Sequence, residues 1–103
     1  MIGGRAGEPY AVSPWEPSFA AQALANAGDP GGAADLMGEA LGQYPGHAGV
    51  LYNAACFEAL AGRREQAMTH LLEAAAADRE SVLKWSAEDS DLDSLRDDPS
   101  FPS

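Results

Sequence analysis

A register of 34 residues constrains the fold of this chain more than any other feature of its sequence. When residues 14–47 are moved along by 34 positions, Gly28 falls on Gly62 and Ala40 falls on Ala74. A fixed period of roughly 20 to 50 residues is the signature of stacked supersecondary units. Because glycine commonly ends a helix and alanine lets two helices approach to about 8 to 10 Å, the register predicts two similar helical hairpins. Other alanines that obey the register are the pairs Ala20 and Ala54, Ala21 and Ala55, and Ala33 and Ala67.

Glycine and proline mark the ends of four expected helices. Ser13 can accept hydrogen bonds from the free amides at the start of the first helix, and Pro14 suits its first position. The glycine-rich run 28–32 interrupts the pattern, as do residues 44–46 and Gly62. We therefore expect two antiparallel pairs, with helices at residues 14–27, 33–43, 48–61 and 64–77.

The remaining residues are expected to form a linker and a lid. Residues 1–13 have no helical period, which predicts an extended linker or the exit from a preceding domain. Residues 82–103 can supply a capping helix and an acidic tail, since the open end of a solenoid must be covered. With repeats at 14–47 and 48–81, the expected fold class is all-α, a short α-solenoid. The side chains expected to dock the lid are Val82, Leu83, Trp85, Leu92, Leu95 and Phe101.

The composition excludes several classes of function. Six basic residues against sixteen acidic ones give a formal charge of -10, which opposes binding to nucleic acid and to anionic membranes. No apolar run approaches the roughly 20 residues that a membrane-spanning helix needs. Cys56 is the single cysteine, so no disulfide can form within the chain, and the start lacks the pattern of a secretion signal. We therefore expect a cytoplasmic protein.

No cluster of residues in the sequence predicts a catalytic site, a metal site or a cofactor. The run Asp89-Ser90-Asp91 imitates the start of a calcium loop, but Ser94 stands where that loop needs its glycine. The acidic residues are better explained as helix caps, with Ser90 or Asp91 capping the turn that follows. No base is placed near Cys56 by the pattern, and a lone helical cysteine usually packs as a small apolar residue.

The hairpin of residues 51–77 has Gly62 between its helices and Ala67 and Ala74 on one face of the second helix, and it resembles the tetratricopeptide repeat. The resemblance covers residues 14–81. It implies an all-α scaffold that binds proteins or peptides in a concave groove lined by the first helix of each repeat. The groove residues that it implies are Ser18, Phe19, Gln22, Asn26, Tyr52, Asn53, Cys56 and Leu60.

The flanking segments resemble the tetratricopeptide tail of bacterial cupin proteins. This resemblance rests on residues 3–10, 13–16 and 91–101. It implies that the first dozen residues leave a cupin barrel. The only histidines, His47 and His70, are 23 positions apart, so no cupin metal ligands carry over to this chain.

Two functions of different class follow from these features. The first is a non-catalytic scaffold that binds a neutral or basic protein segment, because the carboxylate clamp of similar domains is incomplete here. Asn53 matches one member of that clamp, but Ser18 stands at the position of its lysine and Gln22 at that of its second asparagine. The alternative is a structural or self-association module of a larger cupin-containing protein, with a homodimer as one form.

Glu58 stands where the tetratricopeptide family commonly has a large aromatic side chain. A carboxylate at that position should be shielded from water, and it then needs a hydrogen-bond donor. We expect the donor to be Arg63 or Arg64 of the nearby turn, or the indole of Trp85.

Overall fold

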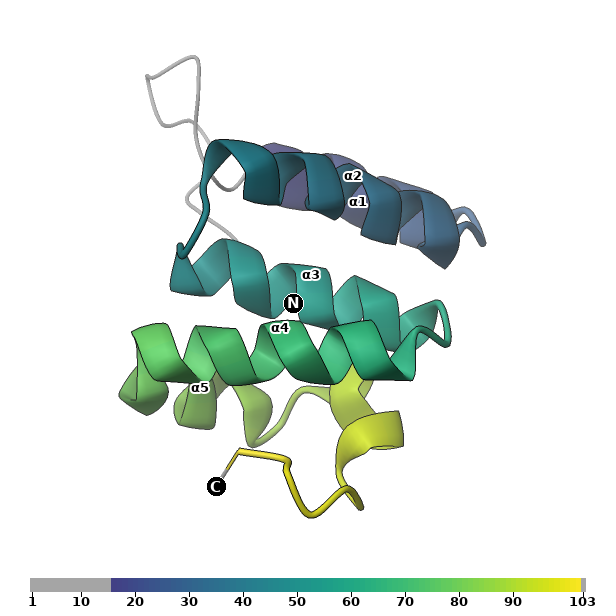
Figure 1. The fold of residues 1–103 in the computed structure, drawn as a ribbon. Helices are drawn as coiled ribbons and strands as arrows, with labels where there is room; N and C mark the ends of the chain where they lie inside the picture. Colours follow the sequence, from purple (N-terminus) through teal and green to yellow (C-terminus); the bar gives the residue numbers. More distant parts are fainter. Residues whose placement is uncertain (1–15, 103) are drawn as a thin grey trace.

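Five α-helices and one 3₁₀ helix form the computed structural model, which describes residues 16–102 (Figure 1). Two antiparallel pairs are stacked, with a shorter C-terminal segment at the lower end of the stack. Within the described range no residue forms a strand, which confirms the predicted all-α fold class. The predicted linker 1–13 and the helix start at Ser13 lie outside the described residues. The elements are α1 (Glu16–Asn26), α2 (Pro30–Gln43), α3 (Ala48–Leu60), α4 (Arg64–Ala77), α5 (Arg79–Ser86) and η1 (Ser90–Leu95).

The turns inside the two helix pairs share one backbone structure. Gly28 and Gly62 adopt φ angles of +88° and +78°, in the left-handed region that glycine enters without steric cost. In each turn, the amide that follows the glycine donates to the carbonyl five positions before it, at 2.9 Å in the first pair and 2.8 Å in the second. These hydrogen bonds satisfy carbonyls at the ends of α1 and α3. The 34-residue register therefore recurs as a shared pattern of backbone hydrogen bonds.

Helix α2 begins earlier than predicted, at Pro30 rather than near Ala33. Oδ1 of Asp29 accepts a hydrogen bond from the amide of Gly32 at 2.9 Å, and Pro30 occupies the first turn of the helix. Proline is tolerated there because that amide would have no partner within the helix. The aspartate cap thus outweighs the low helix propensity of the two glycines that follow Pro30.

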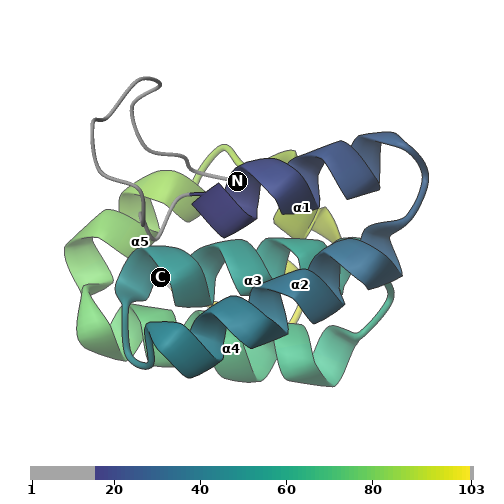
Figure 2. The same ribbon diagram turned by 90° about the horizontal axis from the view of Figure 1, so that it is seen from above.

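Helix α3 is the centre of the molecule, because residues 49–59 are all buried. One side of α3 packs on α1 and α2, in a cluster that includes Met37 and Phe57. The other side packs on α4, α5 and η1, in a cluster that includes Leu71 and Leu92. Figure 2 shows α1 and α2 lying across α3 and α4. The first helix pair and the C-terminal segment therefore pack on opposite sides of one helix, α3.

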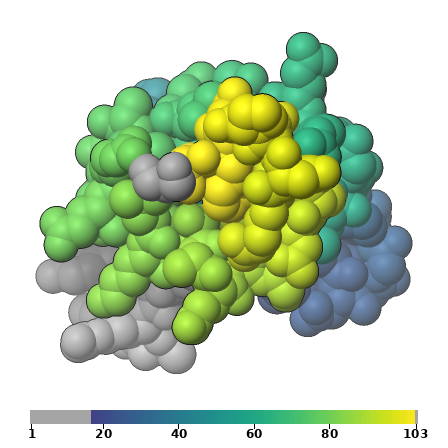
Figure 3. Space-filling view, turned by 90° about the horizontal axis from the view of Figure 1, so that it is seen from below, coloured from purple at the N-terminus to yellow at the C-terminus, as the bar shows by residue number. Residues whose placement is uncertain are grey.

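The C-terminal segment covers the lower end of the stack (Figure 3). Its helix α5 begins at Arg79, three residues before the predicted start of the lid, because the side chain of Asp78 accepts a backbone hydrogen bond and caps it. Val82, Leu92 and Leu95 have no exposed surface. These three side chains confirm that the segment docks on the second pair.

Arg64, in the first turn of α4, also holds this segment. Its guanidinium donates to the carbonyl of Ser94 and lies 3.3 Å from Asp97 and 3.7 Å from Asp98. Because these pairs are largely solvated, each contributes less than about 1 kcal/mol to stability. The apolar side chains of α5 and η1 therefore supply most of the docking energy.

Candidate functional site

The eight predicted groove residues all lie on α1 and α3, the first helices of the two pairs. Half of them have no exposed surface in the structure, while the other half reach solvent. The buried residues are Ser18, Tyr52, Asn53 and Cys56. The residues that reach solvent are Phe19, Gln22, Asn26 and Leu60.

Ser18 and Asn53 connect the two first helices to each other. The side-chain amide of Asn53 donates to Oγ of Ser18 at 2.7 Å, and that hydroxyl lies 3.8 Å from the sulfur of Met37 on α2. Because both side chains are buried, the hydrogen bond between them offsets the water contacts that each has lost. The two residues therefore hold the repeats together from groove positions.

Tyr52 and Cys56 connect α3 to the C-terminal segment. The hydroxyl of Tyr52 donates to Oδ2 of Asp89 at 2.7 Å, and Sγ of Cys56 lies 3.6 Å from the same oxygen. The ring of Tyr52 packs against Trp85, with 5.3 Å between ring centroids. Burial, reinforced by the charge of Asp89, raises the pKa of the Cys56 thiol, and burial also raises the pKa of Tyr52. The thiol is therefore protonated at neutral pH and is a poor nucleophile.

Cys56, Asp89 and Asp91 place three potential metal-ligand atoms within 4.8 Å of one another. A metal would need the thiolate form of Cys56, which its raised pKa opposes. Asp89 also caps η1, because its Oδ1 accepts a hydrogen bond from the amide of Asp91 at 3.1 Å. This cap lies one residue before the predicted ones, and it gives the side chain of Asp89 a structural role at the start of η1.

We term the four groove residues that reach solvent the first-helix stripe. Phe19, Gln22 and Asn26 follow one another at spacings of three and four along α1, so they share one face of that helix. Asn26 and Leu60 occupy the same position of the 34-residue register on α1 and α3. Phe19 and Leu60 are 45% and 44% exposed. The stripe thus combines two apolar side chains with two amides, which hydrogen bond to each other at 2.8 Å.

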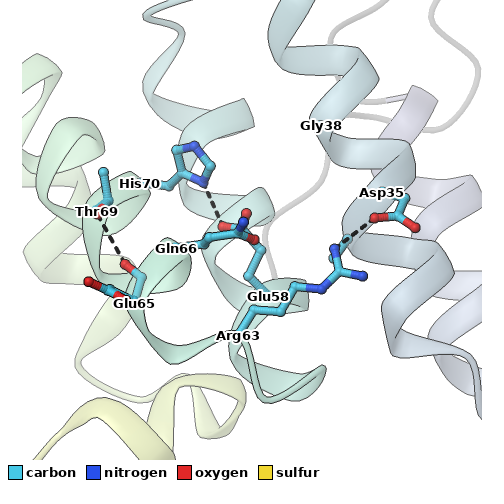
Figure 4. A pocket seen from close by; sticks show the side chains of 9 residues that line it. Asp35, Gly38, Glu58, Arg63, Glu65, Gln66, Thr69 and His70 are labelled. Atoms are coloured by element: carbon cyan, nitrogen blue, oxygen red, sulfur yellow. Dashed lines mark hydrogen bonds and ion pairs between the residues drawn. The ribbon is translucent and has the colours of Figure 1, made fainter.

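Glu58 pairs with His70, not with an arginine or with Trp85 as predicted. Its side chain is only 7% exposed, and its Oε1 lies 2.6 Å from Nδ1 of His70 on α4 (Figure 4). Arg63 instead donates to Asp35 on α2 at 2.7 Å. The expectation that Glu58 is shielded and has a donor is confirmed, but the donor is different. His70 follows the buried Ala67 by three positions and precedes the buried Ala74 by four on α4, and that helical spacing is the signal that could have identified it.

His70 should make the stability of the domain depend on pH. The hydrogen bond to Glu58 raises the pKa of His70 above its ordinary value of 6.5, although partial burial acts in the opposite direction. A group whose pKa is raised on folding stabilises the fold below its unfolded pKa, and this stabilisation is lost as the pH rises through the folded pKa. We expect the difference in unfolding free energy between wild type and His70→Gln to be largest below about pH 6.5 and to shrink above it. Urea unfolding curves over this range measure that difference, and a constant value would contradict a titrating His70.

A comparison with models of protein families matches residues 24–88 to the tetratricopeptide repeat. The match covers more than half of the chain. This protein belongs to the tetratricopeptide repeat family. No curated protein and no solved structure matches the chain.

Tetratricopeptide domains generally act as protein-interaction modules and are typically non-catalytic, so protein partners are the general expectation for this chain. The matched residues begin within α1 and end just after α5. They include Asn26 and Leu60 of the first-helix stripe. In the described part of the chain, no helix has the length and apolar character needed to cross a membrane.

Proposed function

We propose that this tetratricopeptide domain is a non-catalytic scaffold that binds a protein segment along the first-helix stripe. The observation that supports this most is the placement of exposed apolar surface. Three large apolar side chains of the described residues are exposed, and two of them, Phe19 and Leu60, lie at groove positions. Exposed apolar side chains that flank polar groups are typical anchors of a binding surface. Gln22 and Asn26 lie on the same stripe and can pair with the main chain of a bound segment.

The bound segment should be neutral or basic. The chain has a formal charge of -10, and the first-helix stripe contains no basic residue. Asn53, the match to the carboxylate clamp, donates to Ser18 inside the structure. An acidic tail entering this surface would lose its hydration without charge-assisted hydrogen bonds in return. Charge therefore selects against acidic ligands, while the apolar anchors supply affinity.

A random peptide library displayed on phage, selected on the intact chain, tests this proposal. Selected peptides should carry apolar side chains with neutral or basic neighbours. Phe19→Ala and Leu60→Ala should each weaken the binding of these peptides by about tenfold, since truncating an anchor costs more than about 1 kcal/mol. Leu72→Ala is the matched control, because Leu72 is 41% exposed but lies on α4.

Two outcomes would overturn the proposal. Selected peptides could be predominantly acidic, or their binding could be equally strong in the Phe19→Ala, Leu60→Ala and Leu72→Ala variants. In the second case, sedimentation at rising protein concentration would show whether the stripe is instead a self-association surface. A dimer that Phe19→Ala dissociates would favour the structural or self-association role.

The attachment of this domain to a cupin remains a proposal that rests on the sequence resemblance alone, because the family match covers only residues 24–88.

A further inference from the structure

A second surface, formed by the second helices α2 and α4, contains a pocket of about 610 Å³. Figure 4 shows Glu58 and His70 lying at one side of it and the Asp35–Arg63 pair at the other. One wall is made of small residues, and a Cβ added at Gly38 would meet no atom within 4 Å. The pocket therefore has open space beside Gly38.

Glu58 presents one carboxylate oxygen to this pocket. Its Oε1 is paired with His70, and its side chain is 7% exposed. No buried side-chain nitrogen or oxygen of the described residues lacks a hydrogen-bond partner. Among the described residues this carboxylate makes no further hydrogen bond, so its other oxygen keeps some exposed surface, and Glu58 lines the pocket. A mostly buried anionic oxygen facing a pocket favours a cationic ligand.

The other charges of the pocket also favour a cation. Arg63 is the one arginine or lysine in the lining, and Asp35 neutralises it at 2.7 Å. Glu65 also lines the pocket, and Glu73 interacts electrostatically with His70. An anion would meet these carboxylates, whereas an ammonium group could pair with Glu58.

We propose that the α2–α4 pocket binds the lysine side chain of a protein partner. The ammonium group pairs with the free oxygen of Glu58, and the aliphatic stem lies along Ala34 and Gly38, as long basic side chains commonly cover apolar surface. This site is separate from the first-helix stripe, which lies on α1 and α3. The domain can then contact one partner on two faces, or two partners at once.

Binding at this pocket should depend on the protonation of His70. The groups around His70 are Glu58 on α3, Glu73 on its own helix and, across the pocket, the Asp35–Arg63 pair. Protonated His70 neutralises Glu58, while neutral His70 leaves the charge of Glu58 for the ligand. Lysine binding should therefore be stronger at about pH 8 than at about pH 5.5, and the bound probe should lower the pKa of His70.

The test is an NMR titration of the full chain with Nα-acetyl-lysine methylamide, with the norleucine analogue as the uncharged control. The lysine probe should give saturable shift changes at the amides of Glu58, Gln66 and His70, and the norleucine probe should not. Histidine ring shifts recorded against pH, with and without the probe, should show the lowered pKa of His70. A structural Glu58–His70 pair without a binding role would leave that pKa unchanged.

Two variants separate the binding role from the fold. Glu58→Gln should weaken probe binding by about tenfold, since a hydrogen bond to a charged group is lost. Gly38→Leu should block the pocket sterically while leaving the Glu58–His70 pair intact, which provides a test if Glu58→Gln is unstable. Glu80→Gln, on the exposed surface of α5, changes the net charge by the same amount as Glu58→Gln and should have no effect on probe binding. The proposal would be overturned if the probe bound all three variants equally well. It would also be overturned if the shift changes never reached saturation, or if the chain bound acetate in preference to the lysine probe.

Discussion

Replacing Phe57 by alanine is expected to lower the free energy of unfolding by about 3 to 5 kcal/mol. The Phe57 side chain has no exposed surface. It belongs to α3 of the second pair but packs in the cluster formed with α1 and α2. The other buried members of that cluster are five alanines, Met37 and Val50, so most of the buried neighbours are too small to fill the space left by the ring. Since small domains have a total stability of about 5 to 15 kcal/mol, this loss is a large fraction of it.

The same substitution should also reduce the coupling between the two helix pairs. In a stacked repeat protein, each unit is stabilised by its interface with the next one, and Phe57 fills that interface. Urea unfolding followed by circular dichroism should show a lower midpoint and a broader transition. Leu72→Ala, at an exposed site on α4, should change stability by less than about 0.5 kcal/mol. If the two variants unfold at the same urea concentration, the core does not depend on Phe57.

The helical hairpins could be predicted from sequence because their determinants are local and repeat. Gly28 and Gly62 each end a first helix by adopting a left-handed φ angle, a conformation that favours glycine at that point. Alanines at the same register positions then allow the helices to approach closely. Where a side-chain cap competed with this pattern, as Asp29 does, the predicted helix start was wrong by three residues.

The exposure of the groove residues could not be predicted from the register. The resemblance to the tetratricopeptide repeat implies that Tyr52 and Cys56 lie on the groove side of α3, but the 34-residue register does not describe the path of the aperiodic segment 87–89. In the structure, Asp89 at the end of that segment hydrogen bonds to Tyr52 and contacts Cys56. Similarly, the partner of Glu58 depends on the rotation of α4 about its axis, which brings His70 and not Arg63 to the carboxylate. Both are tertiary contacts between residues that carry no shared motif.

Replacing Trp85 by alanine is expected to lower the free energy of unfolding by about 3 kcal/mol, somewhat less than Phe57→Ala because Trp85 is only partly buried. The indole packs against the cluster of α3 and α4 and against the ring of Tyr52, at an interplanar angle of 58°. Such aromatic pairs contribute about 0.5 to 1.5 kcal/mol beyond their burial. For a domain of this size, the melting temperature should fall by about 10 °C or more.

This loss of unfolding free energy should arise from the whole lid, which comprises α5 and η1, because α5 is a helix of eight residues that has little stability of its own. Without the indole, α5 loses its largest apolar contact, and Asp89 is then held against Tyr52 by a weaker element. Hydrogen exchange should therefore accelerate first at the amides of α5 and η1 in the Trp85→Ala variant. Lys84→Ala, at the exposed neighbouring position, should leave both the exchange and the melting temperature unchanged. Equal exchange of α5 in Trp85→Ala and in Lys84→Ala would show that other contacts hold the lid on the stack.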